Sequence, residues 1–286
     1  MNPAIGFALL SLAAAGCLDV TFKQYSQKTR SRGMYAFGCG ATWAVLQATL
    51  FAVRDIAPSF DATTVGFGVI AGIILALANI LLIESLTHLD VSLGSTIYRL
   101  NTIGVVVLSV LFLGEPIAFL KVLGVLSGIL AVWMLYDRKS VHATAHPLSV
   151  FLWVAIAASL LRAVFGIISK AGLQAGADAN AMLLIYALSW VAAGLIYAWL
   201  REKRLRITMQ KVGYGLMSGF LLCVVVNALI EALKLGEVSV MAPIANLSFI
   251  IALLISAVLG MEKLNLRKGL AIASAIASIV LLAQSI

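Results

Sequence analysis

The sequence predicts an all-α polytopic membrane protein with ten transmembrane helices, arranged as two inverted five-helix repeats. Three observations carry this prediction. Hydrophobic residues make up 62% of the 286 positions and charged residues only 11%, which is far outside the composition of a soluble domain. The apolar residues fall into ten runs of about 20 residues, the length that spans a bilayer core. The second half of the chain also repeats the first.

The apolar runs are separated by short polar segments, and no stretch alternates with a period of two residues. An open sheet could not satisfy its backbone groups in lipid, so every run is expected to be a helix. The first run has no basic side chain before it and is long enough to span, so we expect a retained helix and not a signal peptide. The runs cover approximately residues 3–22, 33–53, 65–87, 92–112, 117–136, 148–172, 180–200, 211–233, 238–259 and 267–285.

The two halves match at one constant spacing, without a gap. Residues 1–139 match residues 148–286, and residues 140–147 are left as a linker. Glu115, for example, corresponds to Glu262, 147 positions later. Because each half holds five helices, an odd number, the second half must cross the membrane in the opposite sense. Inverted repeats of this kind are typical of alternating-access carriers, whose sites lie near the midplane between the halves.

The basic residues that give the net charge of +8 are concentrated in alternate loops of the chain. Of the 20 Lys and Arg residues, fourteen lie in alternate connections, and only Arg54, Lys121, Lys170 and Lys234 mark the other side. Basic short loops stay in the cytoplasm. We therefore expect a multi-pass protein of a bacterial-type inner (plasma) membrane, with both termini outside the cytoplasm. A nucleic-acid partner is not expected, because it would need one contiguous basic face.

Several classes of chemistry find no support in the sequence. The three cysteines lie inside predicted helices, and the three histidines lie at helix ends or in the linker without the spacing of metal ligands. No nucleophile motif, phosphate-binding loop or pair of carboxylates is present. We expect neither an enzyme, nor a metal site, nor a cofactor.

The turn Leu113-Gly114-Glu115-Pro116 closes the fourth predicted helix. Together with the two five-helix halves, it resembles the drug/metabolite transporter superfamily in its EamA-like branch, over the full chain. The start at Asn2-Pro3 and Lys23 is also similar to the small multidrug resistance family, although residues 12–16 lack the glutamate that binds proton and cationic drug there. The resemblance implies a cavity lined by the first, third and fourth helices and their copies. Many relatives keep both termini in the cytoplasm, which conflicts with the charge bias.

Substrate-binding candidates are polar residues inside the spans that differ between the halves, because a small metabolite has no two-fold symmetry. Ionisable groups inside a membrane are costly and are functional by default, so Arg99 and Arg162 lead. The alternative for Arg162 is a structural ion pair with Asp19. The full set of candidates is Asp19, Asn79, Tyr98, Arg99, Asn101, Arg162, Asn227, Asn246 and Ser248.

Arg99 is the candidate expected to hold the substrate. Its planar fork of donors suits a carboxylate or a phosphate, and Asn246 and Ser248 would meet the other end of the ligand. The alternative is a structural role, in which Glu84 or a backbone carbonyl holds Arg99.

Two charged pairs are predicted to close the two sides of the membrane in turn, Lys23 with Glu84 and Lys170 with Glu231. The alternative is that these four side chains reach the interface separately. Either glutamate is also a candidate for proton coupling.

Small residues and one proline predict how the helices pack. Gly124-x-x-x-Gly128 and its copy Ala271-x-x-x-Ala275 are assigned to packing within the chain, with a homodimer interface as the alternative. Pro243 is expected to kink the ninth helix, because it removes a backbone hydrogen bond.

These features together predict a secondary active transporter that moves a small anionic or zwitterionic metabolite, such as an amino acid or an organic acid, across the lipid bilayer. Alternating access around a midplane cavity is the expected mechanism. Export as the direction is implied by the resemblance alone. Two alternatives stay open: a flippase for a polar lipid head group, and a non-transporting membrane scaffold with a filled apolar interior.

Overall fold

The computed structural model describes residues 2–26, 31–88, 98–99, 101–135, 148–202, 209–260 and 265–285. Within these residues all regular structure is helical, so the predicted all-α class is confirmed. The predicted linker at 140–147 lies outside them. The helices are α1 (Pro3–Ser26), α2 (Arg32–Val53), α3 (Ala62–His88), α5 (Asn101–Leu113), α6 (Phe119–Leu135), α7 (Leu148–Gln174), α8 (Ala179–Tyr197) with the π-helical η2 (Ala198–Glu202), α9 (Met209–Leu235), α10 (Val238–Asn246), α11 (Phe249–Val258) and α12 (Leu266–Ala283).

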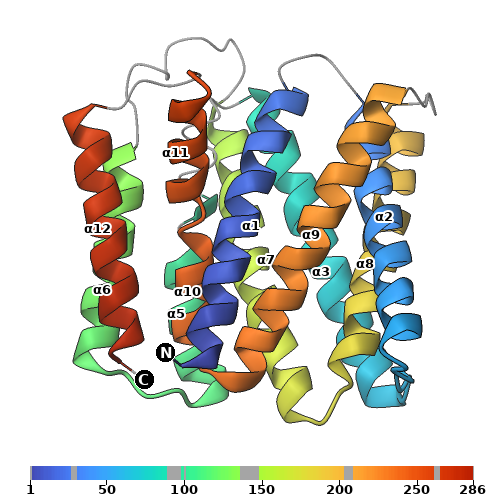
Figure 1. The fold of residues 1–286 in the computed structure, drawn as a ribbon, viewed down its shortest axis with the longest axis horizontal. Coiled ribbons are helices and arrows are strands. Elements are labelled where there is room, and N and C mark those ends of the chain that lie inside the picture. The colour runs from blue at the N-terminus through green and yellow to red at the C-terminus, as the bar shows by residue number, and fades with distance from the viewer. Residues whose placement is uncertain are drawn as a thin grey trace.

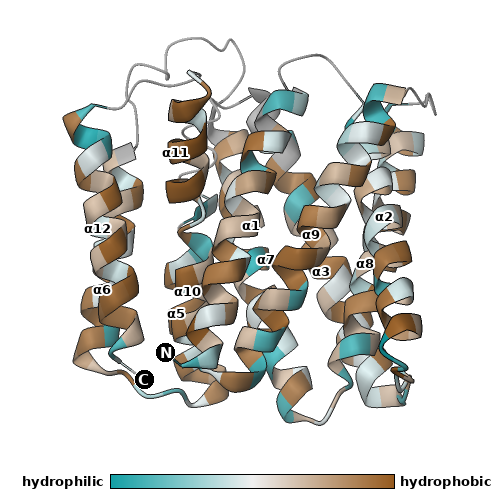
Figure 2. Ribbon diagram, in the orientation of Figure 1, coloured by the Kyte–Doolittle hydropathy of each residue, from teal (hydrophilic) through white to brown (hydrophobic). Residues whose placement is uncertain are grey.

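Eight helical segments of the described chain are long and apolar enough to cross a membrane, with α10 and α11 counted as one segment. Two shorter apolar helices, Asn101–Leu113 and Phe119–Met134, coincide with the two remaining predicted runs. The described helices thus fit the ten predicted runs in position. Hydrophobic residues dominate along the helices, while hydrophilic residues gather mainly at helix ends (Figure 2).

Both chain ends lie on one face of the bundle (Figure 1). We call it the terminal face; it carries Asn2, Ser285 and the turns at 54–61, 114–118, 175–178 and 236–237. The connections therefore alternate between faces, as the charge pattern predicts. Basic residues of the described chain on the opposite face include Arg32, Arg201, Lys211, Arg267 and Lys268.

The packing of the helices is preserved when the two halves of the chain are exchanged. α3 packs against α7 and α8, and in the same way α9 packs against α1 and α2. α2 pairs with α8, and α6 pairs with α12. Ser127 and Ser274, which stand 147 positions apart, each donate a hydroxyl hydrogen bond of 2.8 Å to the other's backbone carbonyl.

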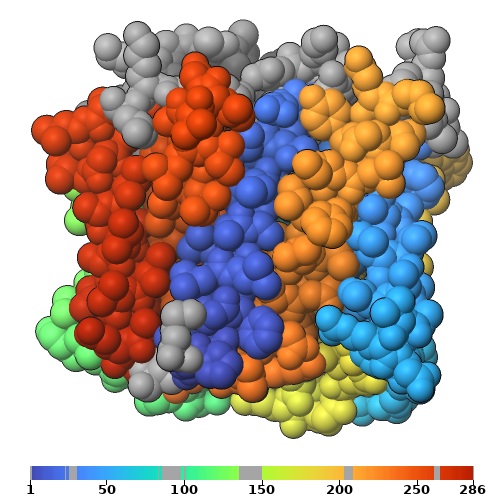
Figure 3. Space-filling view, viewed as in Figure 1, coloured from blue at the N-terminus to red at the C-terminus, as the bar shows by residue number. Residues whose placement is uncertain are grey.

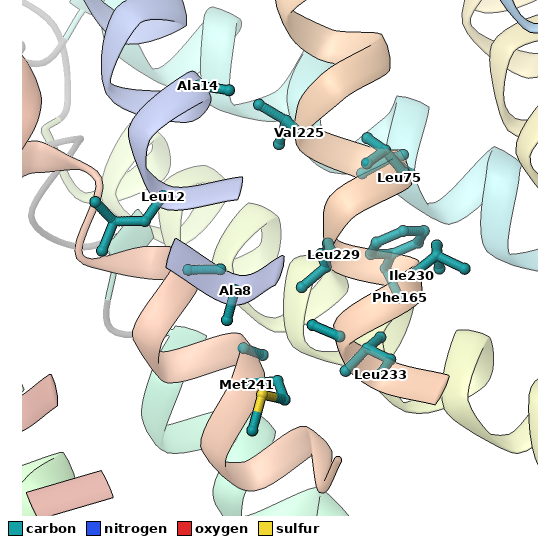
Figure 4. Packing of buried hydrophobic residues seen from close by; sticks show 14 of the residues in the cluster. Ala8, Leu12, Ala14, Leu75, Phe165, Val225, Leu229, Ile230, Leu233 and Met241 are labelled. Atoms are coloured by element: carbon teal, nitrogen blue, oxygen red, sulfur yellow. The ribbon is translucent and has the colours of Figure 1, made fainter. Parts of the chain in front are cut away.

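An apolar core near the centre joins α1 to α9. Ala8 and Leu12 of α1 face this core together with Leu229 and Leu233 of α9, and Met241 adds α10 to it (Figure 4). From outside, α12, α11, α1, α9 and α2 form one face of closely set side chains (Figure 3).

The predicted small-residue motifs are used within the chain. A Cβ atom on Gly124 of α6 would lie 2.8 Å from Leu282 of α12, and the Ser278 hydroxyl donates to the Gly124 carbonyl at 2.6 Å. Ala271 and Ala275 are fully buried. Such close approach is what drives helix association in lipid. These residues therefore hold α6 against α12.

The ninth predicted span is divided at Leu247–Ser248, four residues beyond Pro243. α10 ends at Asn246, and the next backbone hydrogen bonds, from Leu247 to Ile244 and from Ile250 to Leu247, reach back three residues and not four. Pro243 lies inside α10 and lacks the backbone bond to Ser239, but α10 continues past it, so the division is marked by the three-residue bonds at Leu247 and Ile250. The span is thus a discontinuous helix, and the division exposes backbone and side-chain oxygens inside the bundle.

Candidate functional site

Arg99 lies at the division between α10 and α11 and joins three separate elements there. One guanidinium nitrogen, Nη1, donates to the Asn246 carbonyl at 2.9 Å and to the Ser248 hydroxyl at 3.0 Å. The other, Nη2, donates to Asp19 Oδ2 of α1 at 2.6 Å. Arg99 is therefore held by a carboxylate, a hydroxyl and the C-terminal carbonyl of a helix, whose partial negative charge favours a cation.

Asn246 extends this network to the first half of the chain. Its side-chain amide donates to Asn101 Oδ1 at 2.5 Å and to the Thr102 hydroxyl at 3.3 Å. Asn101 is 2% exposed, so this bond is made away from solvent. Five of the nine substrate-binding candidates thus form one continuous hydrogen-bonded network, the Arg99 network: Asp19, Arg99, Asn101, Asn246 and Ser248.

The Asp19–Arg99 pair is shielded on one side only. The Arg99 side chain is 18% exposed, whereas the Asp19 side chain is 43% exposed. The Phe249 ring stands 5.3 Å from the guanidinium carbon and adds a cation–π contact. Asp19 Oδ2 also accepts a hydrogen bond from Ser248 at 3.2 Å. The guanidinium retains further N–H donors beyond the three bonds above.

A cavity of about 10 Å³ adjoins Arg99, the space of about one water molecule. Thr102, Asn246 and Ser278 supply its polar lining with Arg99, and the remaining lining is apolar, from α6 and the α10 segment. The resemblance implied a cavity bounded by the first, third and fourth helices and their copies. The cavity at Arg99 shares two of these walls, α5 and α10 of the predicted fourth and ninth spans, but its other walls are α6 and α12, and it is too small for a metabolite.

Arg162 does not form the ion pair with Asp19 that was the structural alternative for it. Asp19 bonds to Arg99 and Ser248, so the ion pair between Asp19 and Arg162 is not formed. The Arg162 guanidinium carbon lies 5.1 Å from the Phe165 ring, one turn along α7. Tyr98 lies within electrostatic range of Arg162, Asp19 and Arg99.

The two remaining candidates do not contact the Arg99 network among the described residues. Asn79 donates back to the Leu75 carbonyl of its own helix at 2.8 Å. Asn227 donates to Gln47 Oε1 of α2 at 2.9 Å and to the Cys223 carbonyl at 2.8 Å. Asn227 therefore links α9 to α2, which is a packing contact between the halves.

The predicted gating pairs have other partners in this structure. Lys170 donates to the Gly236 carbonyl at 2.8 Å, while Glu231 accepts from Lys234 at 2.6 Å. Lys170 and Glu231 are therefore not paired in this conformation, and their pairing when that side of the membrane is closed stays a prediction. The structural alternative for Arg99 is met in part: Glu84 bonds elsewhere, but a backbone carbonyl, that of Asn246, does accept from Arg99 at 2.9 Å.

Glu84 accepts from the Tyr197 hydroxyl at 2.9 Å and from Arg201 at 3.3 Å. The Lys23 side chain lies outside the described part of the chain, so its predicted pairing with Glu84 stays a prediction.

Two contacts of the site were missed at the level of the sequence. Thr102 was passed over because it is an ordinary helix residue next to Asn101, and Phe249 because aromatic residues in a span are usually packing. One signal was available for Phe249, which directly follows Ser248, a candidate facing Arg99. Asn246 and Ser248 were identified, but for a different role: they hold the arginine directly.

A family model now matches the first half of the chain. Residues 2–137 fit the EamA-like transporter family. This half belongs to that family. The match agrees with the resemblance drawn from the Gly-Glu-Pro turn and the repeat, and this family consists of membrane transporters of small molecules.

The fold of the whole chain also has solved counterparts. One crystal structure superposes with a TM-score of 0.82 over 98% of this chain and 96% of the other, at 13% sequence identity. At this identity the likeness concerns the fold alone. None of the curated proteins matches the chain in sequence.

Proposed function

We propose that the protein is a secondary active exporter of a small anionic or zwitterionic metabolite, and that Arg99 binds the carboxylate of its substrate. The observation that carries this is a charged network placed inside the bundle, at a discontinuous helix where the two halves meet. Discontinuous spans of this kind bind substrates in other carriers, because their free helix ends offer partial charges. A membrane scaffold would need no such interior charge.

The Asp19–Arg99 pair supports a ligand that carries a carboxylate. Asp19 is half-exposed, so an incoming carboxylate can replace it on the guanidinium without first crossing a sealed layer. A zwitterion satisfies both partners, since its carboxylate would bind Arg99 while its ammonium group would bind Asp19. Arg162, which has no carboxylate partner among the described residues, adds the net positive charge that a second acidic group would neutralise.

The exchange symmetry of the packing supports inverted repeats, 1–139 and 148–286. Ala4 at the start of α1 and Lys170 near the end of α7 both lie against Gly236. Equivalent helices thus start on opposite faces of the bundle, as alternating access requires.

A thermal-shift screen of the purified protein against amino acids and organic acids tests the substrate class, and flux into proteoliposomes tests transport. We expect a carboxylate-bearing compound to raise the melting temperature of the wild type and of Arg54→Lys, an exposed control, but not of Arg99→Lys. Flux should fall severely in Arg99→Lys and less in Asn246→Ala. Normal flux in Arg99→Lys would refute the role of Arg99, and flux of lipid head groups alone would favour the flippase.

A further inference from the structure

Glu115 of the first half caps a helix of the second half. Its side chain comes from the α5–α6 turn, where Gly114 has a φ of +67°, and the residue is 8% exposed. One carboxylate oxygen accepts the backbone N–H of Val238 at 2.7 Å, and the other accepts that of Ser239 at 2.9 Å. These are the first two residues of α10. Free N–H groups at a helix start favour an anion, so the carboxylate fixes the end of α10.

The capping carboxylate, Glu115, is distant in sequence from α10, although another carboxylate, Glu237, directly precedes that helix. Glu237 occupies the N-cap position of α10, yet its side chain makes no capping bond. It pairs instead with Lys121 of α6, whose side chain is 2% exposed. Lys121 also donates to the Pro116 carbonyl at 2.7 Å. The α5–α6 turn and the α9–α10 turn are therefore tied twice, once through Glu115 and once through Lys121.

A third charged group reaches the same turn from α7. Lys170 donates to the carbonyls of Leu233 and Gly236, at the end of α9. Its charge also acts on Glu115 and Glu237. If α10 leaves Glu115, the carboxylate has Lys170 within electrostatic range, so the released state is not left with an uncompensated charge.

Glu115 and the Arg99 network lie at opposite ends of one short helix, α10. α10 has 9 residues, which is about 12 Å from its first residue to its last at 1.5 Å per residue. Its first residues bond to Glu115, and its last residue, Asn246, bonds to Arg99 and Asn101. The division at Leu247–Ser248 separates α10 from α11. Movement of the α10 start therefore acts directly on the contacts of Arg99.

We propose that Glu115, together with the Lys121–Glu237 pair, forms a latch that closes the terminal face, and that release of α10 from Glu115 opens the Arg99 network toward that face. This inference rests on the proposed transport function. The small cavity at Arg99 fits the latched state, since a metabolite could reach Arg99 from the terminal face only after α10 moves.

The positions 147 residues away from the latch residues carry the same kinds of charged residue. A second latch on the opposite face would have this sequence pattern. Part of that set lies outside the described residues, so we assign the latch to the terminal face only. The corresponding residues are Glu262 for Glu115, Asp90 for Glu237, Lys268 for Lys121 and Lys23 for Lys170.

Thiol labelling of Met241→Cys tests the latch without a substrate. Met241 is fully buried one turn inside α10. In purified protein we expect a maleimide to label this cysteine at least ten times faster when Glu115→Gln is added, because the amide replaces one acceptor oxygen with a donor. Asp55→Asn is the matched control, an exposed carboxylate on the same face whose φ of 51° suits asparagine, and it should leave the rate unchanged. The protein with Met241 retained gives the background from the native cysteines.

Labelling of native Cys223, 5% exposed in the core, reports whether the fold has loosened. Faster labelling of Met241→Cys with Cys223 unchanged supports the latch. An unchanged rate at Met241→Cys, or an equal rise at Cys223, overturns it. Should Glu115→Gln not fold, Glu115→Asp, which keeps the charge but shortens the reach, carries the same test. A labelling response without flux of any metabolite would reject the proposed transport function and leave the latch standing.

Discussion

The Asp19–Arg99 pair should contribute measurable coupling energy to folding, and a double-mutant cycle can isolate it. Arg99→Met removes three hydrogen bonds and leaves the Asp19 charge unpaired. Hydrogen bonds to charged groups contribute about 1.5–3 kcal/mol each, and the lower end applies because Asp19 is 43% exposed. At about 1.5 kcal/mol for each of its three bonds, Arg99→Met should lower the free energy of unfolding by about 4–5 kcal/mol, and Asp19→Asn should lower it by about 1–2 kcal/mol.

The double variant should lose less than the sum of the two single losses, by about 1–2 kcal/mol. Hydrogen bonds between membrane helices average about 0.6 kcal/mol and reach about 1.7 kcal/mol, so a coupling of about 1–2 kcal/mol lies at the upper end of that range, as expected for a charged pair. Unfolding in increasing sodium dodecyl sulfate, followed by circular dichroism, measures all four proteins. Additive losses, within about 0.5 kcal/mol, would mean that Asp19 and Arg99 do not pair in the folded protein, and the Arg99 network as described would be refuted.

Three further predictions follow from the packing, the charge bias and a helix cap. Gly194→Ala should destabilise the protein by about 1–3 kcal/mol, because its Cβ would lie 2.3 Å from the Phe37 backbone nitrogen, while Gly213→Ala, with open space around it, should not; equal melting temperatures would contradict this. A reporter that is fluorescent only in the cytoplasm, fused after Ile286, should give no signal, because the C-terminus is predicted to lie outside. A fluorescent signal would reverse the predicted orientation. The Thr64 backbone N–H lowers the pKa of Asp61 from its usual 3.8, so this cap stabilises the protein above that pH and is lost as the pH falls through the lowered pKa. Asp61→Asn should therefore have a lower melting temperature than the wild type at pH 7 and the same melting temperature at pH 2. Equal melting temperatures at both pH values would show that the Asp61 cap does not stabilise the protein.

The sequence determined the class of the protein because lipid leaves a chain few choices. A span must be helical and apolar, so composition and the length of the apolar runs suffice to predict the helices. The same solvent makes any interior charge costly, which is why Arg99 and Asp19 stood out without any structure. The repeat and its spacing were also legible in the residues themselves.

Pairing was decided only in three dimensions. Asp19 was a reasonable partner for Arg162 by charge, but Arg99 stands at 2.6 Å from it, because the division after Pro243 brings the α10 end and Ser248 to the same point. Lys170 bonds to backbone carbonyls and not to Glu231. The end of a helix, here α9, leaves carbonyls without partners inside the helix, and no pattern of side chains reveals which group they will meet. The role of Glu115 was hidden for the same reason: its partners are two backbone N–H groups, which every residue but proline possesses, and only the folded chain decides which of them a carboxylate meets.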